Sequence, residues 1–156
     1  MDNTYDKLTR FCLYRERCTY EVMHKMYALE VLPDDKEKFI QQLKEERYLD
    51  DERFIKAYIH TKIYIKKWGK NKIRAELSMK KLDKSLTKKI LEEVDDELYI
   101  DNLHHLASRK WESLYKKEYR ERQASLFRYL ASKGYEPDLM MDWVKEHTKN
   151  KIFRDA

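Results

Sequence analysis

The sequence predicts an all-α protein built from tandem three-helix repeats. The chain has 156 residues but only two glycines and two prolines, whereas strands joined by hairpins need turn residues at frequent intervals. Charged residues make up 40% and apolar residues 42%, a balance typical of amphipathic helices with long polar faces. Aromatic residues make up 13% and apolar residues recur in register, which argues against intrinsic disorder. We therefore expect about nine helices in an elongated, curved, right-angled or solenoid-like stack.

The second observation is a repeat with a period of about 51–53 residues. The two prolines, Pro33 and Pro137, lie 104 residues apart. Apolar residues near the first proline have apolar counterparts one and two periods later: Val22 with Ile73 and Leu126, Met26 with Leu77 and Leu130, Val31 with Leu82 and Tyr135, and Phe39 with Ile90 and Trp143. Three copies predict repeats at residues 1–48, 49–95 and 96–156.

Each copy is expected to contain three helices. One helix ends near the third matched position, and after a short turn the next begins at Pro33, after Asp83, or at Pro137. Proline suits the first helical position because its missing N–H has no partner there, and aspartate is a good N-cap. The third copy opens with a long helix over about residues 97–117.

The leading helix of the middle copy is predicted from Asp50 or Asp51 to Trp68, with Gly69 ending it. Two apolar stripes run along the surface of this helix. One stripe consists of Phe54, Tyr58, Thr61, Ile65 and Trp68, and the other of Ile55, Ile59 and Ile63. A helix that is apolar on two sides packs on two neighbours. We therefore assign both stripes to the core, and not to base stacking.

Positive charge is concentrated in the middle third of the chain. Residues 56–89 contain 12 Lys or Arg against 2 acidic residues, while the segments before and after are slightly acidic. Of the basic residues, Lys70, Arg74 and Lys81 are predicted to share one outward helix face. Such a one-signed patch is typical of binding to nucleic acid or to an acidic protein surface, and a solvated face is the plain alternative. The candidate contact residues are Lys62, Lys66, Lys67, Lys70, Lys72, Arg74 and Lys81.

No catalytic or metal motif accompanies this charge. HExxH, P-loop and GxSxG patterns do not occur, and the five histidines are scattered. Cys12 and Cys18 match no zinc or redox spacing, and we interpret them as thiols of a cytosolic protein. The sequence shows no transmembrane run and no apolar signal segment. We expect a cytoplasmic, non-enzymatic protein with no catalytic residues, cofactor, metal or membrane contact.

The stretch from Tyr48 to Val94 resembles the RecX family of bacterial regulators of the RecA recombinase. The family pattern is a leucine and two aspartates before a phenylalanine helix, then a basic helix, a glycine and an isoleucine–glutamate–leucine helix. Many members have proline where this chain has Lys70, and a lysine–glycine pair where it has Lys80–Lys81; Lys133–Gly134 restores that pair in the third copy. The matching residues are Leu49, Asp50, Asp51, Phe54, Gly69, Ile73, Glu76 and Leu77, with Lys62 in the basic helix.

The resemblance implies a non-enzymatic clamp that lies in the groove of the RecA–DNA filament. Such a protein lowers RecA's ATP hydrolysis and strand exchange, and so moderates recombination and the SOS response. We expect a monomer whose basic residues contact the filament. The alternative is a sequence-nonspecific DNA-binding helical repeat protein that acts through its basic central repeat. The helix after Gly69 begins with KNKIR, in which lysine predominates, and lysine contacts to phosphate carry no base-sequence information. Any DNA binding should therefore be weak, nonspecific and strongly salt-dependent.

Overall fold

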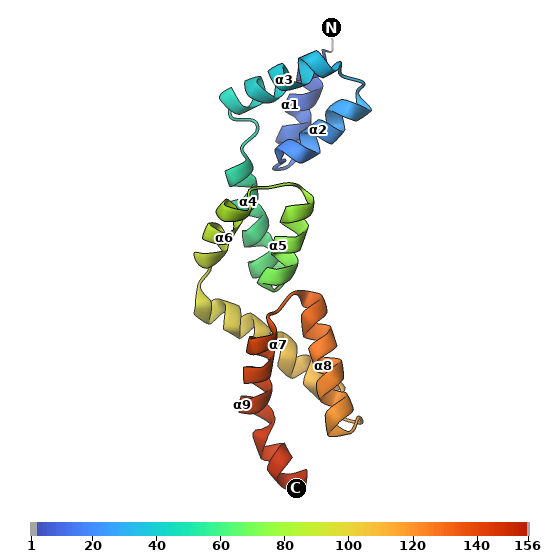
Figure 1. Ribbon diagram of the computed structural model, residues 1–156, viewed down its shortest axis with the longest axis vertical. Coiled ribbons are helices and arrows are strands. Elements are labelled where there is room, and N and C mark those ends of the chain that lie inside the picture. Colours follow the sequence, from blue (N-terminus) through green and yellow to red (C-terminus); the bar gives the residue numbers. More distant parts are fainter. Residues whose placement is uncertain (1–2, 156) are drawn as a thin grey trace. The chain divides into compact units, whose positions relative to one another are not determined.

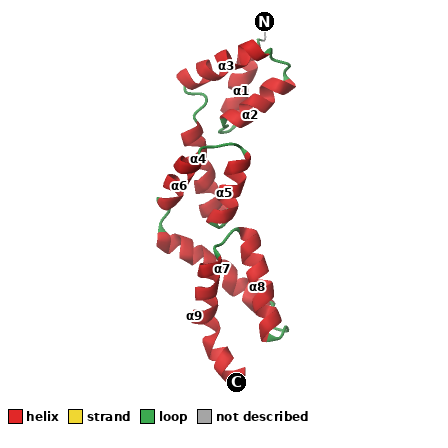
Figure 2. Cartoon of the chain, in the orientation of Figure 1, coloured by secondary structure: helices red, strands yellow, loops and turns green. Residues whose placement is uncertain are grey.

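The computed structural model describes residues 3–155, and the side chains of residues 3–148. This part of the chain forms nine α-helices and one short π-helix, with no strand (Figures 1 and 2). The predicted all-α class is confirmed. The elements are α1 (Thr4–Tyr14), α2 (Thr19–Ala28), α3 (Pro33–Glu45), α4 (Asp51–His60), the π-helix η1 (Thr61–Ile65), α5 (Lys70–Met79), α6 (Lys84–Glu92), α7 (Asp96–Ser113), α8 (Tyr119–Lys133) and α9 (Pro137–Asp155).

The helices form two compact units. The first contains the described residues up to His60 together with Glu76–Ile90, and the second contains Thr61–Ala75 together with the described residues from Leu91 onward. The unit boundary falls within α5, so these units do not follow the three predicted repeat ranges. The repeat ranges and the elongated, curved shape both stay predictions.

In the first unit, α2 packs against both α1 and α3. The Asn3 side chain caps α1 by accepting a hydrogen bond from the Asp6 N–H at 2.8 Å. Pro33 occupies the first turn of α3, as the sequence predicts. The apolar core of these three helices is formed by Leu8, Cys12, Val22, Met26, Ile40, Leu43 and Leu49.

The helices α2, α5 and α8 end in the same turn, which also follows α3, where Arg47 has a φ of 64° and the Tyr48 N–H bonds to the Leu43 carbonyl at 2.9 Å. Each has one residue with positive φ just after the helix, namely Glu30 (58°), Lys81 (57°) and Gly134 (99°). The next residue donates its N–H to the carbonyl five residues earlier, which is the Schellman arrangement. The three bonds are Val31 to Met26 at 3.0 Å, Leu82 to Leu77 at 3.3 Å and Tyr135 to Leu130 at 3.1 Å. Val31, Leu82 and Tyr135 are the predicted repeat partners, so the three matched positions have the same backbone geometry.

The other repeat positions agree with this. Val22, Ile73 and Leu126 are all fully buried. After the α5 turn, the Asp83 side chain accepts a hydrogen bond from the Leu86 N–H at 2.9 Å and so caps α6, as predicted. Three-helix repeats therefore arise from apolar spacing combined with a shared helix end.

In the second unit, α8 packs against both α7 and α9. The predicted extension of α7 to Lys117 is wrong, because the helix ends at Ser113. The buried Arg122 side chain donates to the Trp111 carbonyl from Nε at 2.9 Å and from Nη2 at 2.6 Å. Its guanidinium also lies 4.0 Å from the centre of the Trp111 ring. A basic side chain from α8 thus satisfies a carbonyl at the end of α7.

Candidate functional site

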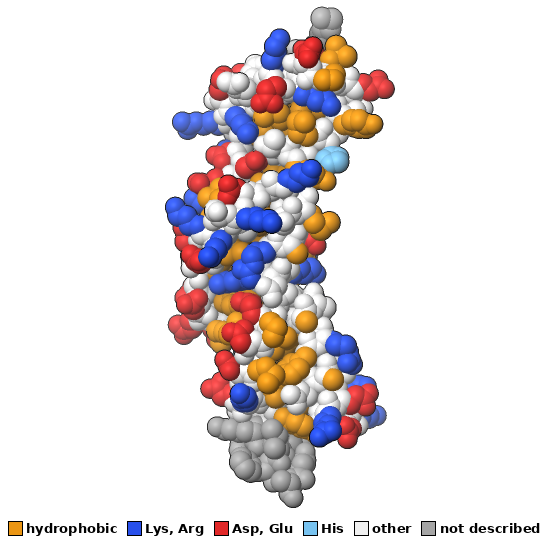
Figure 3. Space-filling model, in the orientation of Figure 1, with side chains coloured by type: hydrophobic (Ala, Val, Ile, Leu, Met, Phe, Trp, Pro, Cys, Tyr) orange, Lys and Arg blue, Asp and Glu red, His pale blue; other side chains and the backbone are white. Residues whose placement is uncertain are grey.

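The candidate basic face lies on η1, on the turn between η1 and α5, and on the first half of α5. It comprises six residues of the second unit: Lys62, Lys66, Lys67, Lys70, Lys72 and Arg74. Lys66 and Arg74 are exposed, and the other four are half-buried. Figure 3 shows Lys and Arg side chains gathered over α5 and α6. Lys81 does not share a helix face with Lys70 and Arg74, since α5 ends at Met79 and Lys81 belongs to the first unit.

The helix before this face does not end as predicted. The chain is α-helical to His60, π-helical over Thr61–Ile65, and leaves the helix at Lys67, whose φ is 56°. The Trp68 N–H then bonds to the Lys62 carbonyl at 2.8 Å. The prediction that Gly69 ends a helix at Trp68 is therefore wrong, because Lys67 takes the left-handed conformation.

The π-turn also changes which residues face the core. Ile55, Ile59 and Ile63 are buried as predicted, but Ile65 is 66% exposed and Trp68 is only half-buried. A wider i→i+5 turn rotates the residues that follow it relative to the α-helical stripe. The assignment of Ile65 and Trp68 to the core is therefore wrong.

The Trp68 ring organises two lysines of the basic face. The Lys62 ammonium lies 4.4 Å and the Lys72 ammonium 4.1 Å from the ring centre. Cation–π contacts of this kind contribute about 0.5–1 kcal/mol each at exposed sites. The indole therefore holds two positive charges from opposite ends of the basic turn close together.

Two tyrosines of the second unit hold the backbone of the basic turn. The Tyr99 hydroxyl accepts a hydrogen bond from the Lys70 N–H at 2.8 Å and donates to Glu136 at 2.5 Å. The Tyr135 hydroxyl donates to the Lys67 carbonyl at 2.7 Å. Burial and the Glu136 hydrogen bond raise the pKa of Tyr99, and burial raises the pKa of Tyr135, so both hydroxyls stay protonated at neutral pH.

The two glycines of the chain meet at the start of α5. The Gly69 N–H bonds to the Lys133 carbonyl at 2.7 Å, and the Asn71 N–H bonds to the Gly134 carbonyl at 2.9 Å. A Cβ on Gly69 would lie 2.2 Å from the Gly134 carbonyl carbon, and one on Gly134 would lie 2.4 Å from the Lys72 Cβ. Only glycine permits so close an approach of backbones. We call this contact the glycine joint; it fixes the start of α5 and with it the basic face.

The residues of the family motif lie in the interior or at helix starts. Asp50 accepts a hydrogen bond from the Arg53 N–H in the first turn of α4, and Asp51 accepts two from Thr19. Gly69 forms the glycine joint, and Glu76 is half-buried on α5. The remaining four are buried apolar residues: Leu49, Phe54, Ile73 and Leu77. The motif therefore shapes the fold, and the basic residues within its span remain the candidates for contact.

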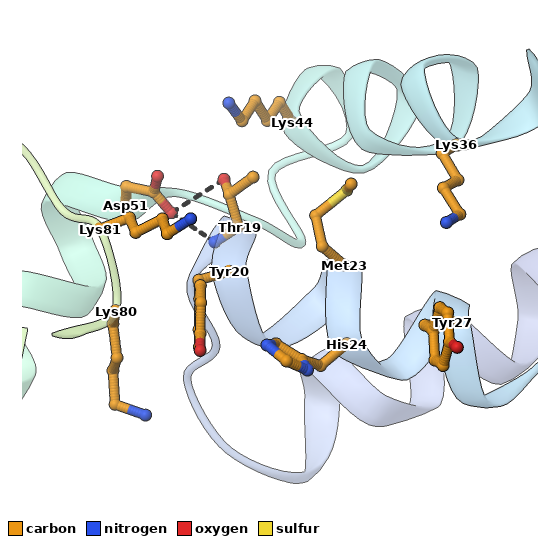
Figure 4. Close-up of a pocket in the computed structure, with 10 residues that line it drawn as sticks. All are labelled: Thr19, Tyr20, Met23, His24, Tyr27, Lys36, Lys44, Asp51, Lys80 and Lys81. Carbon is orange, nitrogen blue, oxygen red and sulfur yellow. Dashed lines mark hydrogen bonds between the residues drawn. The ribbon is translucent and has the colours of Figure 1, made fainter. Parts of the chain in front are cut away.

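A groove in the first unit is a feature that the sequence reasoning missed. Its volume is about 680 Å³, and it is lined by α2, α3, the first turn of α4 and the turn after α5 (Figure 4). Lys36, Lys44, Lys80 and Lys81 stand around it, and only Lys81 was predicted to contact a partner. These lysines come from separate segments, so no local spacing in the sequence signals them.

Among the described side chains, those of residues 3–148, no cluster of three or more His, Cys, Asp or Glu residues has the arrangement of a metal site. Over the described helices, residues 4–155, none combines the length and the apolar character that crossing a membrane requires.

The fold and the basic face define a helical-repeat protein suited to binding a partner. Models of the second and third three-helix domains of RecX match residues 50–91 and 96–144, which together make up more than half of the chain. The chain belongs to the RecX family.

Two curated relatives show the extent of the similarity. A "Regulatory protein RecX" of Clostridium botulinum (strain Eklund 17B / Type B) is 36% identical over 118 residues, which cover 74% of this chain and 55% of the relative. A "Regulatory protein RecX" of Legionella pneumophila (strain Corby) is 27% identical over 150 residues, which cover 94% of this chain and 95% of the relative. The chain spans about half the length of the clostridial relatives that it matches.

Solved structures show the same fold. RecX from Lactobacillus salivarius superposes with a TM-score of 0.82 at 22% identity, covering 91% of this chain and 92% of that chain. A second solved structure, of a regulatory protein RecX, superposes with a TM-score of 0.82 at 19% identity, covering 94% of this chain and 71% of that chain. The tandem three-helix architecture is therefore confirmed.

Proposed function

We propose that this chain is a non-enzymatic regulator of the RecA recombinase. It binds the RecA–DNA filament and lowers RecA's ATP hydrolysis and strand exchange, and so moderates recombination and the SOS response. It acts as a monomer in the cytoplasm, without a cofactor. The observation that carries the proposal is membership of the RecX family, whose curated relatives are named as regulatory proteins.

The charge of the basic face supports an anionic partner. In the described chain, no carboxylate forms an ion pair with Lys66, Lys67, Lys70, Lys72 or Arg74. Charges without a local counterion attract phosphates or acidic loops, and they make binding sensitive to salt. Lysine contacts to phosphate carry no base-sequence information, so any direct DNA contact would be nonspecific.

The anchoring of the basic face supports a defined docking geometry. The glycine joint and the two tyrosine hydrogen bonds fix the backbone from Lys67 to Asn71 before any partner arrives. A binding surface that is ordered in advance loses less conformational entropy on association.

The test is the DNA-dependent ATPase of RecA, measured with and without this protein at near-physiological salt. We compare the wild type with Lys66→Glu/Arg74→Glu, which reverses two exposed charges on the basic face. The matched control is Lys88→Glu/Lys89→Glu, which reverses two exposed charges on α6. We expect substoichiometric wild type to suppress hydrolysis, the basic-face variant to be weaker by about tenfold or more, and the control to stay within about twofold.

Two results would contradict the proposal in different ways. If the wild type leaves hydrolysis unchanged but binds single- or double-stranded DNA alone, the protein is the nonspecific DNA binder of the alternative interpretation. If both double variants lose suppression equally, regulation does not depend on the basic face.

A further inference from the structure

The groove of the first unit has chemistry that the proposed filament contact does not use. Lys36 and Lys44 extend from α3 on one side, and Lys80 and Lys81 come from the turn after α5 on the other, with Met23 between them (Figure 4). All of these segments belong to one compact unit, so the groove is a property of that unit alone.

The floor of the groove is apolar. Met23 is 39% exposed and Tyr27 is 79% exposed, on a side of α2 next to its buried Val22 and Met26. Tyr20 lies beside His24 with ring centres 4.4 Å apart. Methionine adapts its shape to different apolar groups and favours contact with aliphatic and aromatic side chains. The floor therefore suits an inserted apolar side chain.

The rim is positively charged. Asp51 is the one carboxylate among the described lining residues, and Thr19 satisfies it with hydrogen bonds of 2.7 Å from N and 3.0 Å from Oγ1. Lys80 pairs with Glu21 at 3.2 Å, whereas Lys44 and Lys81 form no ion pair in the described chain. At least two positive charges, on opposite sides of an apolar floor, therefore lack a negative partner.

We propose that the groove binds an acidic peptide segment of a partner protein, with one apolar side chain on the floor and carboxylates against Lys44 and Lys81. Charge complementarity with an apolar centre favours a peptide over a nucleic acid. The Tyr20 ring already contacts His24, with ring centres 4.4 Å apart, and the exposed Met23 on the floor offers an aliphatic surface that suits an apolar side chain. This inference does not rest on the RecA proposal.

The probe is a fluorescein-labelled peptide with four Asp or Glu residues on each side of one leucine. Its partner probe has serine in place of the leucine. Fluorescence anisotropy at about 0.15 M salt, where exposed charges are largely screened beyond about 8 Å, reports binding to the wild type. We expect the leucine peptide to bind at least about fivefold more tightly than the serine peptide, because burying the side chain adds apolar contact.

Three variants locate the site. Lys44→Glu/Lys81→Glu should weaken binding by about tenfold or more, because two facing charges are reversed. Lys38→Glu/Lys88→Glu makes the same charge change at exposed positions of the same unit that do not line the groove, and should stay within about twofold. Met23→Ser should abolish the preference for leucine over serine. Circular dichroism and urea titration confirm that each variant is folded.

Three outcomes would overturn the proposal. One is equal loss of peptide binding in the groove and control variants. Another is binding of a ten-nucleotide thymidylate that the groove variant abolishes while neither peptide binds, which would make the groove a nucleic-acid surface. The third is concentration-dependent dimerisation in sedimentation velocity that the groove variant abolishes, which would make a second copy of the chain the occupant.

Discussion

The turn after α8 and the turn after α5 have the same hydrogen-bonded geometry but opposite surroundings. The α8 turn places Gly134 against Gly69, and the backbones touch. The α5 turn places Lys81 at the rim of a groove, and Lys80 reaches Glu21 of α2 through a salt bridge. One repeated element thus serves as a closed joint in one unit and as an open rim in the other.

The difference lies in two side chains. One period before Gly69 the chain has Cys18, and in place of Gly134 the α5 turn has Lys81. Glycine on both sides lets two helix ends meet through backbone hydrogen bonds. The α5 turn is instead linked to α2 by the Lys80–Glu21 salt bridge, and it borders the groove. The repeat therefore sets the position of each turn, and the residue in the left-handed position decides what that turn does.

The largest effect is expected from closing the space in the glycine joint. Gly69→Ala puts a Cβ at 2.2 Å from the Gly134 carbonyl carbon, where neither backbone can yield cheaply. We expect a loss of roughly 3 kcal/mol or more in the free energy of unfolding, measured by urea denaturation. Cys18→Ala, at the equivalent position, should cost only about 1 kcal/mol. Equal losses would mean that the two turns are packed alike.

The next effect concerns the hydrogen bonds beside the joint. Tyr99→Phe removes the acceptor of the Lys70 N–H and the donor to Glu136. A lost buried hydrogen bond costs about 1–3 kcal/mol, and amide exchange at Lys70 should become faster. Tyr14→Phe is the control, since Tyr14 is 84% exposed and should change stability by less than about 0.5 kcal/mol. Unchanged exchange at Lys70 would show that Tyr99 does not anchor the turn.

A smaller effect with the opposite sign is expected at the open turn. Lys81→Gly removes the left-handed strain and should stabilise the protein by about 0.5–1 kcal/mol. Lys81→Ala removes the same charge but keeps the Cβ, so its stability should stay near that of the wild type. Thermal or urea unfolding of the pair separates backbone strain from charge. If alanine stabilises as much as glycine, charge repulsion and not strain is responsible.

The smallest effect is a pH dependence that belongs to the open turn alone. Burial by itself raises the pKa of Glu21, but the hydrogen bond from Arg15 and the charge of Lys80 outweigh it and hold the pKa below its ordinary value. The carboxylate therefore contributes stability that is complete above the unfolded pKa, about 4.3, and is lost as pH falls through the lower folded pKa. Urea midpoints at pH 3 and pH 7 should differ less in Glu21→Gln and in Lys80→Ala than in the wild type. An unchanged difference in both would remove Glu21 from the acid sensitivity.

The sequence predicts what depends on local spacing. Pro33 and Asp83 mark helix starts because proline and aspartate act within one turn, and the matched apolar positions mark helix ends because each copy repeats them. The concentration of lysines near Gly69 is likewise visible in the sequence. These local features are enough to place the basic face on a turn between two helices.

What the sequence does not predict depends on distant partners. The glycine joint connects residues 65 positions apart, and the sequence around either glycine does not indicate that the other is its partner. Within the π-helix at Thr61–Ile65, the Ile63 carbonyl accepts a hydrogen bond from the buried Asn102 side chain at 2.9 Å. The local sequence pattern does not show this distant contact. The prediction therefore assumes an unbroken α-helix and wrongly assigns Trp68 to the core. The groove combines lysines from separate segments, and local spacing misses it for the same reason.

The glycine joint also has a consequence during synthesis on the ribosome. The first unit is complete once residues up to Ile90 have emerged, whereas Gly69 must wait for Gly134. At roughly 5–20 residues per second, this delay lasts a few seconds. Throughout it, the last residues of α5 already have their partners while the first ones do not. In a nascent chain the lysines of the basic face therefore lie on a turn that is not yet anchored. The basic face becomes ordered only when Gly134 and Tyr135 have been synthesised and can bond to this turn.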